Sequence, residues 1–160
     1  MAIIYVAEDI GALVQEQKST TAAFLLNYHV VFRTKRNRRV LEGEVGREGL
    51  RLILDVAERR DYKILAAALM PDHVHLVIAL TPSDRVSDAV RYFKGTTARF
   101  LREKFPRLRE AAPSLWSEGY YVESLGLKNV KQVLSYVSRQ EEHHGGEHDA
   151  GRSRRHTPRE

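Results

Sequence analysis

Two histidines, His73 and His75, are separated by a single valine in an apolar stretch that continues to Leu80. Val, Ile and Leu dominate this stretch, which is too short to span a membrane and has the length of an inner β-strand. Side chains alternate between the two faces of a strand, so both imidazoles are predicted to lie on one face. Paired imidazoles on a rigid strand can ligate a metal ion. The alternative is a chance pairing, because the chain contains seven histidines.

A second pair of chemically useful residues, Tyr136 and Gln140, lies one helical turn apart near the end of the chain. The same segment carries an apolar stripe with helical spacing, made of Val130, Val133, Leu134 and Val137. At about 100° per residue, the phenol and the amide fall beside this stripe on one side of the helix. Two polar residues that merely face solvent are the alternative.

The segments that must position these four residues alternate between strand and helix patterns. Strands are predicted at 24–32, at 63–69, through the two histidines to Leu80, and at 115–125. Helices are predicted from Val45, from Thr81 to about Pro106, and from Asn129. Thr81 is expected to cap the second helix, with Pro82 at its first position. Asn129 is expected to open the last, with Gln132 completing a box-like cap.

This order, β-α-β-β-α-β followed by a helix, predicts an α+β fold of the ferredoxin-like (RRM-like) type. In such a fold an antiparallel sheet carries two helices on one face. The last helix, which holds Tyr136, is extra. It must therefore pack on the other face of the sheet or on a partner subunit.

The composition fits one soluble globular domain with a sizeable core: 160 residues, 42% hydrophobic and 29% charged. The chain has no cysteine, which excludes disulfides and thiolate metal sites, so a metal must use imidazole, carboxylate or amide ligands. No membrane span, secretory signal or lipidation motif is visible, and we expect a cytoplasmic protein.

Basic residues outnumber acidic ones, 26 to 21, giving a formal net charge of +5 that permits a polyanionic partner. They are concentrated in two series. One series comprises Arg33, Lys35, Arg36, Arg38 and Arg39, and the other Arg91, Lys94, Arg99, Arg102, Lys104, Arg107 and Arg109. A solvated face or a disordered arm is the alternative interpretation of either series.

Three regions are expected along the chain. Residues 1–20 form an N-terminal extension of uncertain structure, and residues 21–142 form the single domain. Residues 143–160 are rich in Gly, His and Arg without periodicity, so we expect a disordered tail.

The histidine strand with its Met-Pro-Asp lead-in at 70–72, followed much later by the 136–140 segment, resembles a known family. It is similar to the single-domain HUH tyrosine transposases of insertion sequences, small enzymes often called TnpA or IS200-like that move single-stranded DNA. Further matching segments lie in the right order, so that the resemblance spans roughly 24–142: they are 27–35, 93–99, 102–106, 116–122 and 125–126.

The resemblance implies a role for each candidate residue. His73, His75 and Gln140 would ligate Mg²⁺ or Mn²⁺. Tyr136 would attack a DNA phosphorus, leaving a 5′-phosphotyrosine and a free 3′-hydroxyl. Members of the family are homodimers in which the tyrosine helix acts in trans, and Gly126 is placed to be the hinge. The implied function is cleavage and rejoining of single-stranded DNA at element ends that fold into hairpins.

Within this interpretation the basic residues become candidate DNA contacts, namely Arg33, Lys35, Arg36, Arg38, Lys94 and Arg99. Three alternatives remain open at the level of sequence. One is a domesticated relative acting on chromosomal repeats. Another is a ferredoxin-like module that binds RNA or single-stranded DNA without cutting it. In the third, a metal only staples the strand to the last helix.

Overall fold

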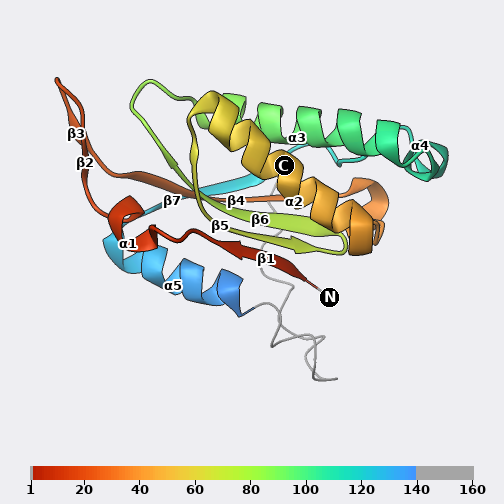
Figure 1. The fold of residues 1–160 in the computed structure, drawn as a ribbon, viewed down its shortest axis with the longest axis horizontal. Coiled ribbons are helices and arrows are strands. Elements are labelled where there is room, and N and C mark those ends of the chain that lie inside the picture. Colours follow the sequence, from red (N-terminus) through yellow and green to blue (C-terminus); the bar gives the residue numbers. More distant parts are fainter. Residues whose placement is uncertain (1, 140–160) are drawn as a thin grey trace.

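The computed structural model describes residues 2–139 and contains one five-stranded sheet in the order β1-β5-β6-β4-β7 (Figure 1). Every neighbouring pair in the sheet is antiparallel. The strands are β1 Ile3–Val6, β4 Leu26–Arg33, β5 Lys63–Met70, β6 His73–Leu80 and β7 Tyr121–Leu125. A separate two-stranded arm pairs β2 Gln17–Lys18 with β3 Ala23–Phe24.

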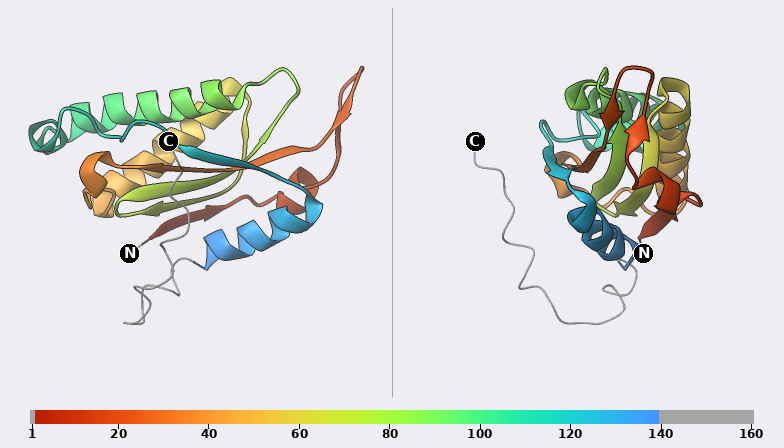
Figure 2. Two further views of the ribbon diagram at one scale, coloured as in Figure 1. Left: turned by 180° about the vertical axis from the view of Figure 1, so that it is seen from behind. Right: turned by 90° about the vertical axis from the view of Figure 1, so that its left-hand side faces the viewer.

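Two long helices, α2 Gly43–Arg60 and α3 Val86–Lys104, cover one face of the sheet, and α5 Leu127–Ser138 lies against the other (Figure 1, Figure 2). The order β4-α2-β5-β6-α3-β7 confirms the predicted ferredoxin-like arrangement, with the tyrosine helix on the opposite face. The shorter helices are α1 Ile10–Leu13, η1 Lys35–Asn37 and α4 Arg107–Ala111. No helix among the described residues is long and apolar enough to cross a membrane.

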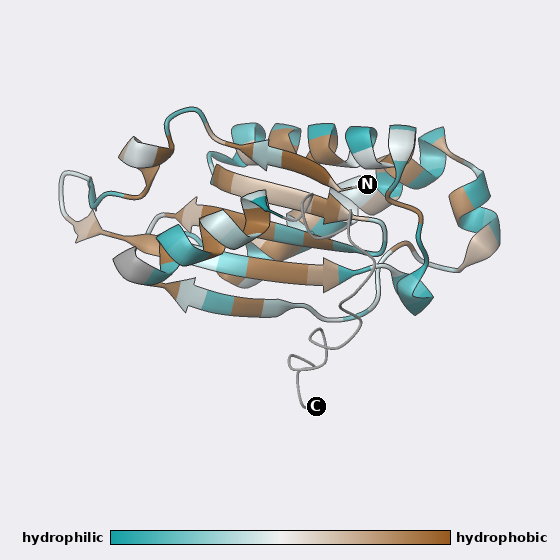
Figure 3. Cartoon of the chain, turned by 90° about the horizontal axis from the view of Figure 1, so that it is seen from below, coloured by the Kyte–Doolittle hydropathy of each residue, from teal (hydrophilic) through white to brown (hydrophobic). Residues whose placement is uncertain are grey.

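Strand alternation divides the apolar residues between two cores. Figure 3 shows that hydrophobic residues make up much of the central strands. Phe32, Leu76 and Ile78 face α2 and α3 in the larger core, which includes Ile53 and Phe93 from the helices. Val77 and its neighbours face α5 in a smaller core, together with Leu65, Ala66, Ala68, Leu125, Val130 and Val137. The apolar stripe predicted for the last helix is therefore confirmed, and α5 has only a small apolar contact to hold it.

Residues 3–6, for which the sequence predicted no defined element, form the edge strand β1 and pair with β5 from Ile3↔Leu69 to Val6↔Ala66. The side chain of Ile3 reaches over α2 at Gly46. A Cβ there would clash with Ile3 Cδ1 and would lie 2.7 Å from the Leu41 carbonyl oxygen. Gly46 thus permits β1 and the helix to approach closely.

The predicted helix starts are wrong in two places. Helix α3 begins at Val86, because the Asp84 carboxylate accepts hydrogen bonds from the N–H and hydroxyl of Thr81 and closes a turn ahead of the helix. Helix α5 begins at Leu127 after Gly126, with no side-chain cap, so Asn129 lies inside its first turn. The predicted end of the second helix before Pro106 is confirmed.

The predicted strand 115–125 is too long, since β7 begins only at Tyr121. Its first part is instead an irregular segment tied to the end of β4. The Ser117 N–H donates to the Arg33 carbonyl, and Trp116 forms an isolated bridge with Thr34. Lys94 Nζ donates to the carbonyl oxygens of Ser117 and Gly119, each at 2.9 Å. These carbonyls therefore bond to a side chain and not to a strand.

Candidate active site

The two candidate ligands lie at the start of β6, on the sheet face that carries α5. The His73 and His75 ring centroids are 4.9 Å apart with an interplanar angle of 75°. Their placement on one face is as the alternation predicted. His73 pairs with Arg33 and His75 with Val31 across β4, so the site lies at the end of β4 where the basic series begins.

Each of these imidazoles has a neighbour at Nδ1. His73 Nδ1 lies 2.6 Å from Asp72 Oδ1, and His75 Nδ1 lies 3.1 Å from His29 Nε2. A histidine that donates its Nδ1–H carries its lone pair on Nε2, and a second group at Nδ1 is the usual arrangement around a ligating imidazole. The donor set at these two residues therefore fits a metal ion.

His29 and Glu123 belong to the site, although the sequence analysis did not single them out. His29 Nδ1 lies 3.3 Å from Glu123 Oε1, and the Tyr121 hydroxyl donates to Glu123 Oε2 at 2.9 Å. His29 also stacks on His75, with ring centroids 5.3 Å apart. The signal available in the sequence was the alternation along β4, which places His29 on the same face as Val31 and Arg33.

Burial keeps the inner imidazoles neutral. It lowers the pKa of His75 to about 3, aided by the nearby charges of His73, His29 and Arg33. Burial also lowers the pKa of His29, against the opposing effect of the Glu123 carboxylate. Since only a neutral imidazole can ligate a metal, the site holds these groups in the ligating form near neutral pH.

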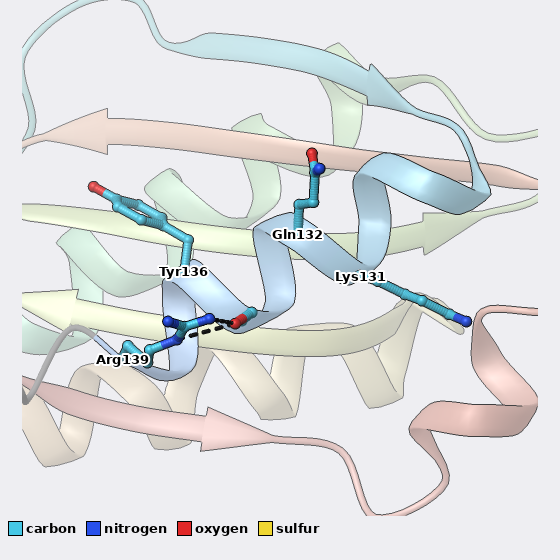
Figure 4. Close-up of a pocket in the computed structure, with 5 residues that line it drawn as sticks. Lys131, Gln132, Tyr136 and Arg139 are labelled. Carbon is cyan, nitrogen blue, oxygen red and sulfur yellow. Dashed lines mark hydrogen bonds between the residues drawn. The ribbon is translucent and has the colours of Figure 1, made fainter.

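Tyr136 lies on α5, beside the buried stripe as predicted, with 51% of its surface exposed. Its ring meets the His75 ring edge-on, with centroids 5.9 Å apart. This contact is made within one chain. A hollow of about 490 Å³ adjoins the phenol, and its lining within the described part of the chain comes from α5: Lys131, Gln132, Ser135, Tyr136 and Arg139 (Figure 4).

The third predicted ligand, Gln140, lies outside the described residues, as does the predicted tail. Within residues 2–139, no group of three or more His, Asp or Glu side chains is arranged to hold a metal ion. A metal ion held by His73 and His75 would thus need further ligands from elsewhere.

The predicted DNA contacts lie in different settings. Arg33 and Arg36 are exposed, Lys35 is half-buried, and the Arg99 guanidinium lies 5.2 Å from the Phe100 ring. Lys94 holds the segment before β7 through two carbonyl oxygens.

The Arg38 side chain makes hydrogen bonds to backbone carbonyls of the η1 turn and of the segment before β7. Its Nε donates to the Lys35 carbonyl and its Nη2 to the Ser114 carbonyl. Its Nη1 is buried without a hydrogen-bond partner among the described residues, and Arg102 Nε is in the same condition. Burial, and then the neighbouring charges of Arg36 and Arg102, lower the pKa of Arg38. Three guanidinium groups therefore lie close together at this end of the molecule.

The predicted hinge, Gly126, is exposed and extended, with φ −79° and ψ 173°. A Cβ at this position would meet nothing within 4 Å, so the conformation described here does not itself require glycine.

Comparisons with known proteins point to one family. The model of the family described as "Transposase IS200 like" matches residues 22–140. The chain is 32% identical over 127 residues to the ISDra2 transposase TnpA of Deinococcus radiodurans, covering 78% of this chain and 90% of that protein. It is 32% identical over 115 residues to the transposase for insertion sequence element IS200 of Salmonella typhimurium, covering 71% and 75%.

Solved structures agree with these sequence matches. A crystal structure of a Deinococcus radiodurans R1 protein assigned as a transposase superposes with a TM-score of 0.66 at 29% identity, covering 78% of this chain and 97% of that one. The structure of a REP-associated tyrosine transposase bound to a REP hairpin gives a TM-score of 0.58 at 16% identity, covering 81% and 75%. The second match shows that the fold is shared.

Proposed function

The chain belongs to the family of IS200-like transposases, and on this premise we propose that it cleaves and rejoins single-stranded DNA with Tyr136 as the nucleophile. The observation that carries the proposal is the edge-on contact of the Tyr136 ring with His75, 5.9 Å between centroids. It brings the one exposed phenol of α5 to the paired imidazoles of β6. A tyrosine in a merely structural role has no need of such neighbours.

The proposed reaction exchanges one phosphodiester for another. Tyr136 Oη bonds to the scissile phosphorus as the bond from phosphorus to the 3′ oxygen breaks. The phenol loses its proton, and the departing 3′ oxygen gains one. The product is a 5′-phosphotyrosine and a free 3′-hydroxyl. Because the covalent link keeps a phosphodiester bond, another 3′-hydroxyl can reverse the step without ATP.

We propose that His73, His75 and Gln140 hold Mg²⁺ or Mn²⁺ during this reaction. When bound, the cation would polarise the scissile phosphate, which is otherwise a poor electrophile. The two imidazoles support this assignment because both have a hydrogen-bonding neighbour at Nδ1. The burial of His75 adds support, since it disfavours the protonated form that cannot ligate.

The DNA substrate would be a hairpin-bearing single strand at the end of a mobile element, handled in the cytoplasm. A related fold has been solved bound to a REP hairpin. We propose that phosphates are contacted by Arg33, Lys35, Arg36, Arg38, Lys94 and Arg99. To these we add Arg102, because its charge lies close to that of Arg38.

We further propose that the protein acts as a homodimer in which α5 can serve the partner's site. The phenol lies at the His75 of its own chain in the structure described here. Gly126, between β7 and α5, is where the chain would turn to carry α5 across.

The nucleophile is tested by a covalent adduct. Incubated with labelled hairpin-bearing single-stranded DNA and Mn²⁺, the protein should form an adduct that survives denaturation, and Tyr136→Phe should form none while still binding the strand. Tyr120→Phe is the matched control, since Tyr120 is also exposed and precedes β7. An adduct formed by Tyr136→Phe would refute the assignment. Binding that is indifferent to EDTA and yields no adduct in the unaltered protein would favour a non-catalytic binding module.

Mixing two inactive variants separates action within a chain from action across the dimer. Tyr136→Phe lacks the nucleophile, and His73→Gln lacks a ligand. If α5 serves the partner's site, a mixed dimer contains one site with both defects and one intact site, and cleavage should return. If each chain uses its own tyrosine, cleavage should stay absent at every mixing ratio.

A further inference from the structure

We propose that Glu123 and His29 act as positioning residues that fix the tautomer of His75, so that its Nε2 lone pair faces the cation. The inference rests on the proposed function only in taking His75 as a metal ligand. The geometry that carries it is an unbroken series of hydrogen-bond contacts across three strands. Glu123 on β7 meets His29 on β4 at 3.3 Å, and His29 meets His75 on β6 at 3.1 Å.

The direction of the series is set by the carboxylate. An ionised Glu can only accept hydrogen bonds, so the proton between Glu123 Oε1 and His29 Nδ1 belongs to His29. The other carboxylate oxygen already accepts from the Tyr121 hydroxyl at 2.9 Å, which helps to hold Glu123 in place. A neutral His29 with its proton on Nδ1 has a lone pair on Nε2.

The lone pair of His29 then dictates the state of His75. Nε2 of His29 faces Nδ1 of His75, so the shared proton must sit on His75 Nδ1. A neutral His75 with its proton on Nδ1 has its lone pair on Nε2, which is the nitrogen left to ligate. Asp72 stands in the same relation to Nδ1 of His73 at 2.6 Å. Both candidate ligands are thus set to use Nε2.

Packing makes the series rigid. His29 and His75 are 9% and 8% exposed, and their rings stack with an interplanar angle of 16°. His29 pairs directly with Glu123 across β4 and β7, so the strand ladder itself sets the spacing between the two side chains. Glu123 lies at the accessible end, with a side chain 41% exposed, and can be altered without opening the core.

The test compares Glu123→Gln with the unaltered full-length protein in two measurements. A glutamine amide can either accept from or donate to His29 Nδ1, and the donating form reverses every proton in the series. Nitrogen-15 NMR of the metal-free protein should therefore show His75 with its proton on Nδ1 in the unaltered protein, and a mixture of tautomers in the variant. The affinity for Mn²⁺ alone, measured by calorimetry, should fall about 10- to 100-fold.

Glu118→Gln, at an exposed position on the segment before β7, is the matched control and should change neither measurement. If DNA cleavage is followed, Glu123→Gln should lower kcat at limiting Mn²⁺ with little change in KM for the strand, and saturating Mn²⁺ should restore kcat. An unchanged His75 tautomer together with unchanged Mn²⁺ affinity would overturn the proposal. If Glu123→Gln changes the tautomer of His75 but the unaltered protein does not bind Mn²⁺, then Glu123 and His29 do set the tautomer, and His75 is not a metal ligand.

Discussion

Single residues at the candidate site owe their chemical state to burial more than to charge partners. His75 is neutral because the sheet and α5 remove it from water, and the positive charges around it act in the same direction. Tyr136 differs, since half of its surface is open to solvent. The buried His75 beside the exposed Tyr136 would, under the proposed function, allow a DNA strand to approach the phenol without disturbing this imidazole.

The lowered pKa of His75 predicts how stability depends on pH in the metal-free protein. The unfolded chain takes up a proton on this residue as the pH falls below 6.5, whereas the folded chain resists until about pH 3. The free energy of unfolding should therefore be fully present above pH 6.5 and decline as the pH falls through this window. Urea titrations at pH 7, 6 and 5 measure the decline, which should be shallower in His75→Gln. An equal slope in the two proteins would contradict the prediction.

At the residue scale, the sequence predicted the shared face of His73 and His75 because alternation on a strand is a local rule. The exposed position of Tyr136 beside an apolar stripe followed from helical spacing in the same way. His29 was missed since its role depends on the pairing of β4 with β6 and β7, which no local pattern reveals. Gln140 stays a prediction because it lies outside the described residues.

Among the longer helices, α5 packs on the smaller of the two cores, whereas α2 and α3 share the larger one. The sheet face beneath α5 also contains a polar defect. Asn27 on β4 is 2% exposed, and both atoms of its side-chain amide lack a hydrogen-bond partner among the described residues. Burying an amide in this way costs free energy, which weakens the packing on that face.

Replacing this amide should stabilise the protein. Asn27→Leu fills a similar volume and removes the unpaired donor and acceptor, so the free energy of unfolding should rise by about 1–3 kcal/mol. Denaturant unfolding measures the change, and hydrogen exchange should show slower opening of α5. Asn129→Leu, at an exposed position in the first turn of α5, is the control, with little expected effect. A destabilised Asn27→Leu would show that the amide has a partner that matters.

The identity and order of the longer elements from β4 to α5 were predictable, but several of their boundaries were not. The apolar stripes of α2, α3 and α5 span many residues and dominate the pattern. A helix start depends on one or two hydrogen bonds. Thr81 was expected to cap the helix that follows it, but its N–H and hydroxyl donate to the Asp84 carboxylate instead, and α3 begins later. The start of β7 likewise depends on Lys94, which lies 23 residues before Ser117 in the chain.

Across the whole molecule, basic residues meet at one end. The η1 turn, the β5–β6 turn and the corner between α3 and α4 all lie there (Figure 1). Thr34 links the first two, since its hydroxyl lies within hydrogen-bond distance of the carbonyl oxygens of Arg38 and Asp72. Arg102, on α3, lies close enough to Arg38 for its positive charge to lower the pKa of Arg38. This end therefore joins a cationic surface to the start of β6, where His73 lies.

The basic end predicts a change in salt dependence. Arg102→Met should weaken binding of single-stranded DNA and reduce the slope of log affinity against log salt by about 0.7, the value expected for one lost phosphate contact on a single strand. Arg59→Met is the control, because Arg59 pairs with Asp55 on α2 and lies at the far end of that helix. Fluorescence anisotropy at several salt concentrations measures the slope. An equal change in both variants would point to net charge alone.

At this largest scale the sequence predicted the fold class and the family resemblance, while the fifth strand was missed. Four residues, Ile3 to Val6, are too few for a clear alternation, and they become a strand only because β5 offers a free edge and Gly46 makes room. A strand that forms because of such tertiary contacts cannot be predicted from the local sequence pattern alone.

The strand order has one more consequence, for a chain still being made on the ribosome. Glu123, His29 and His75 occupy β7, β4 and β6, and Tyr136 follows on α5, so the groups gathered at the site come from almost the full length of the described chain. A nascent polypeptide that has emerged only through β6 contains both imidazoles of that strand but neither the carboxylate nor the phenol. Under the proposed function, nicking activity should thus be withheld until α5 has emerged, which spares the cell's DNA from shorter nascent chains.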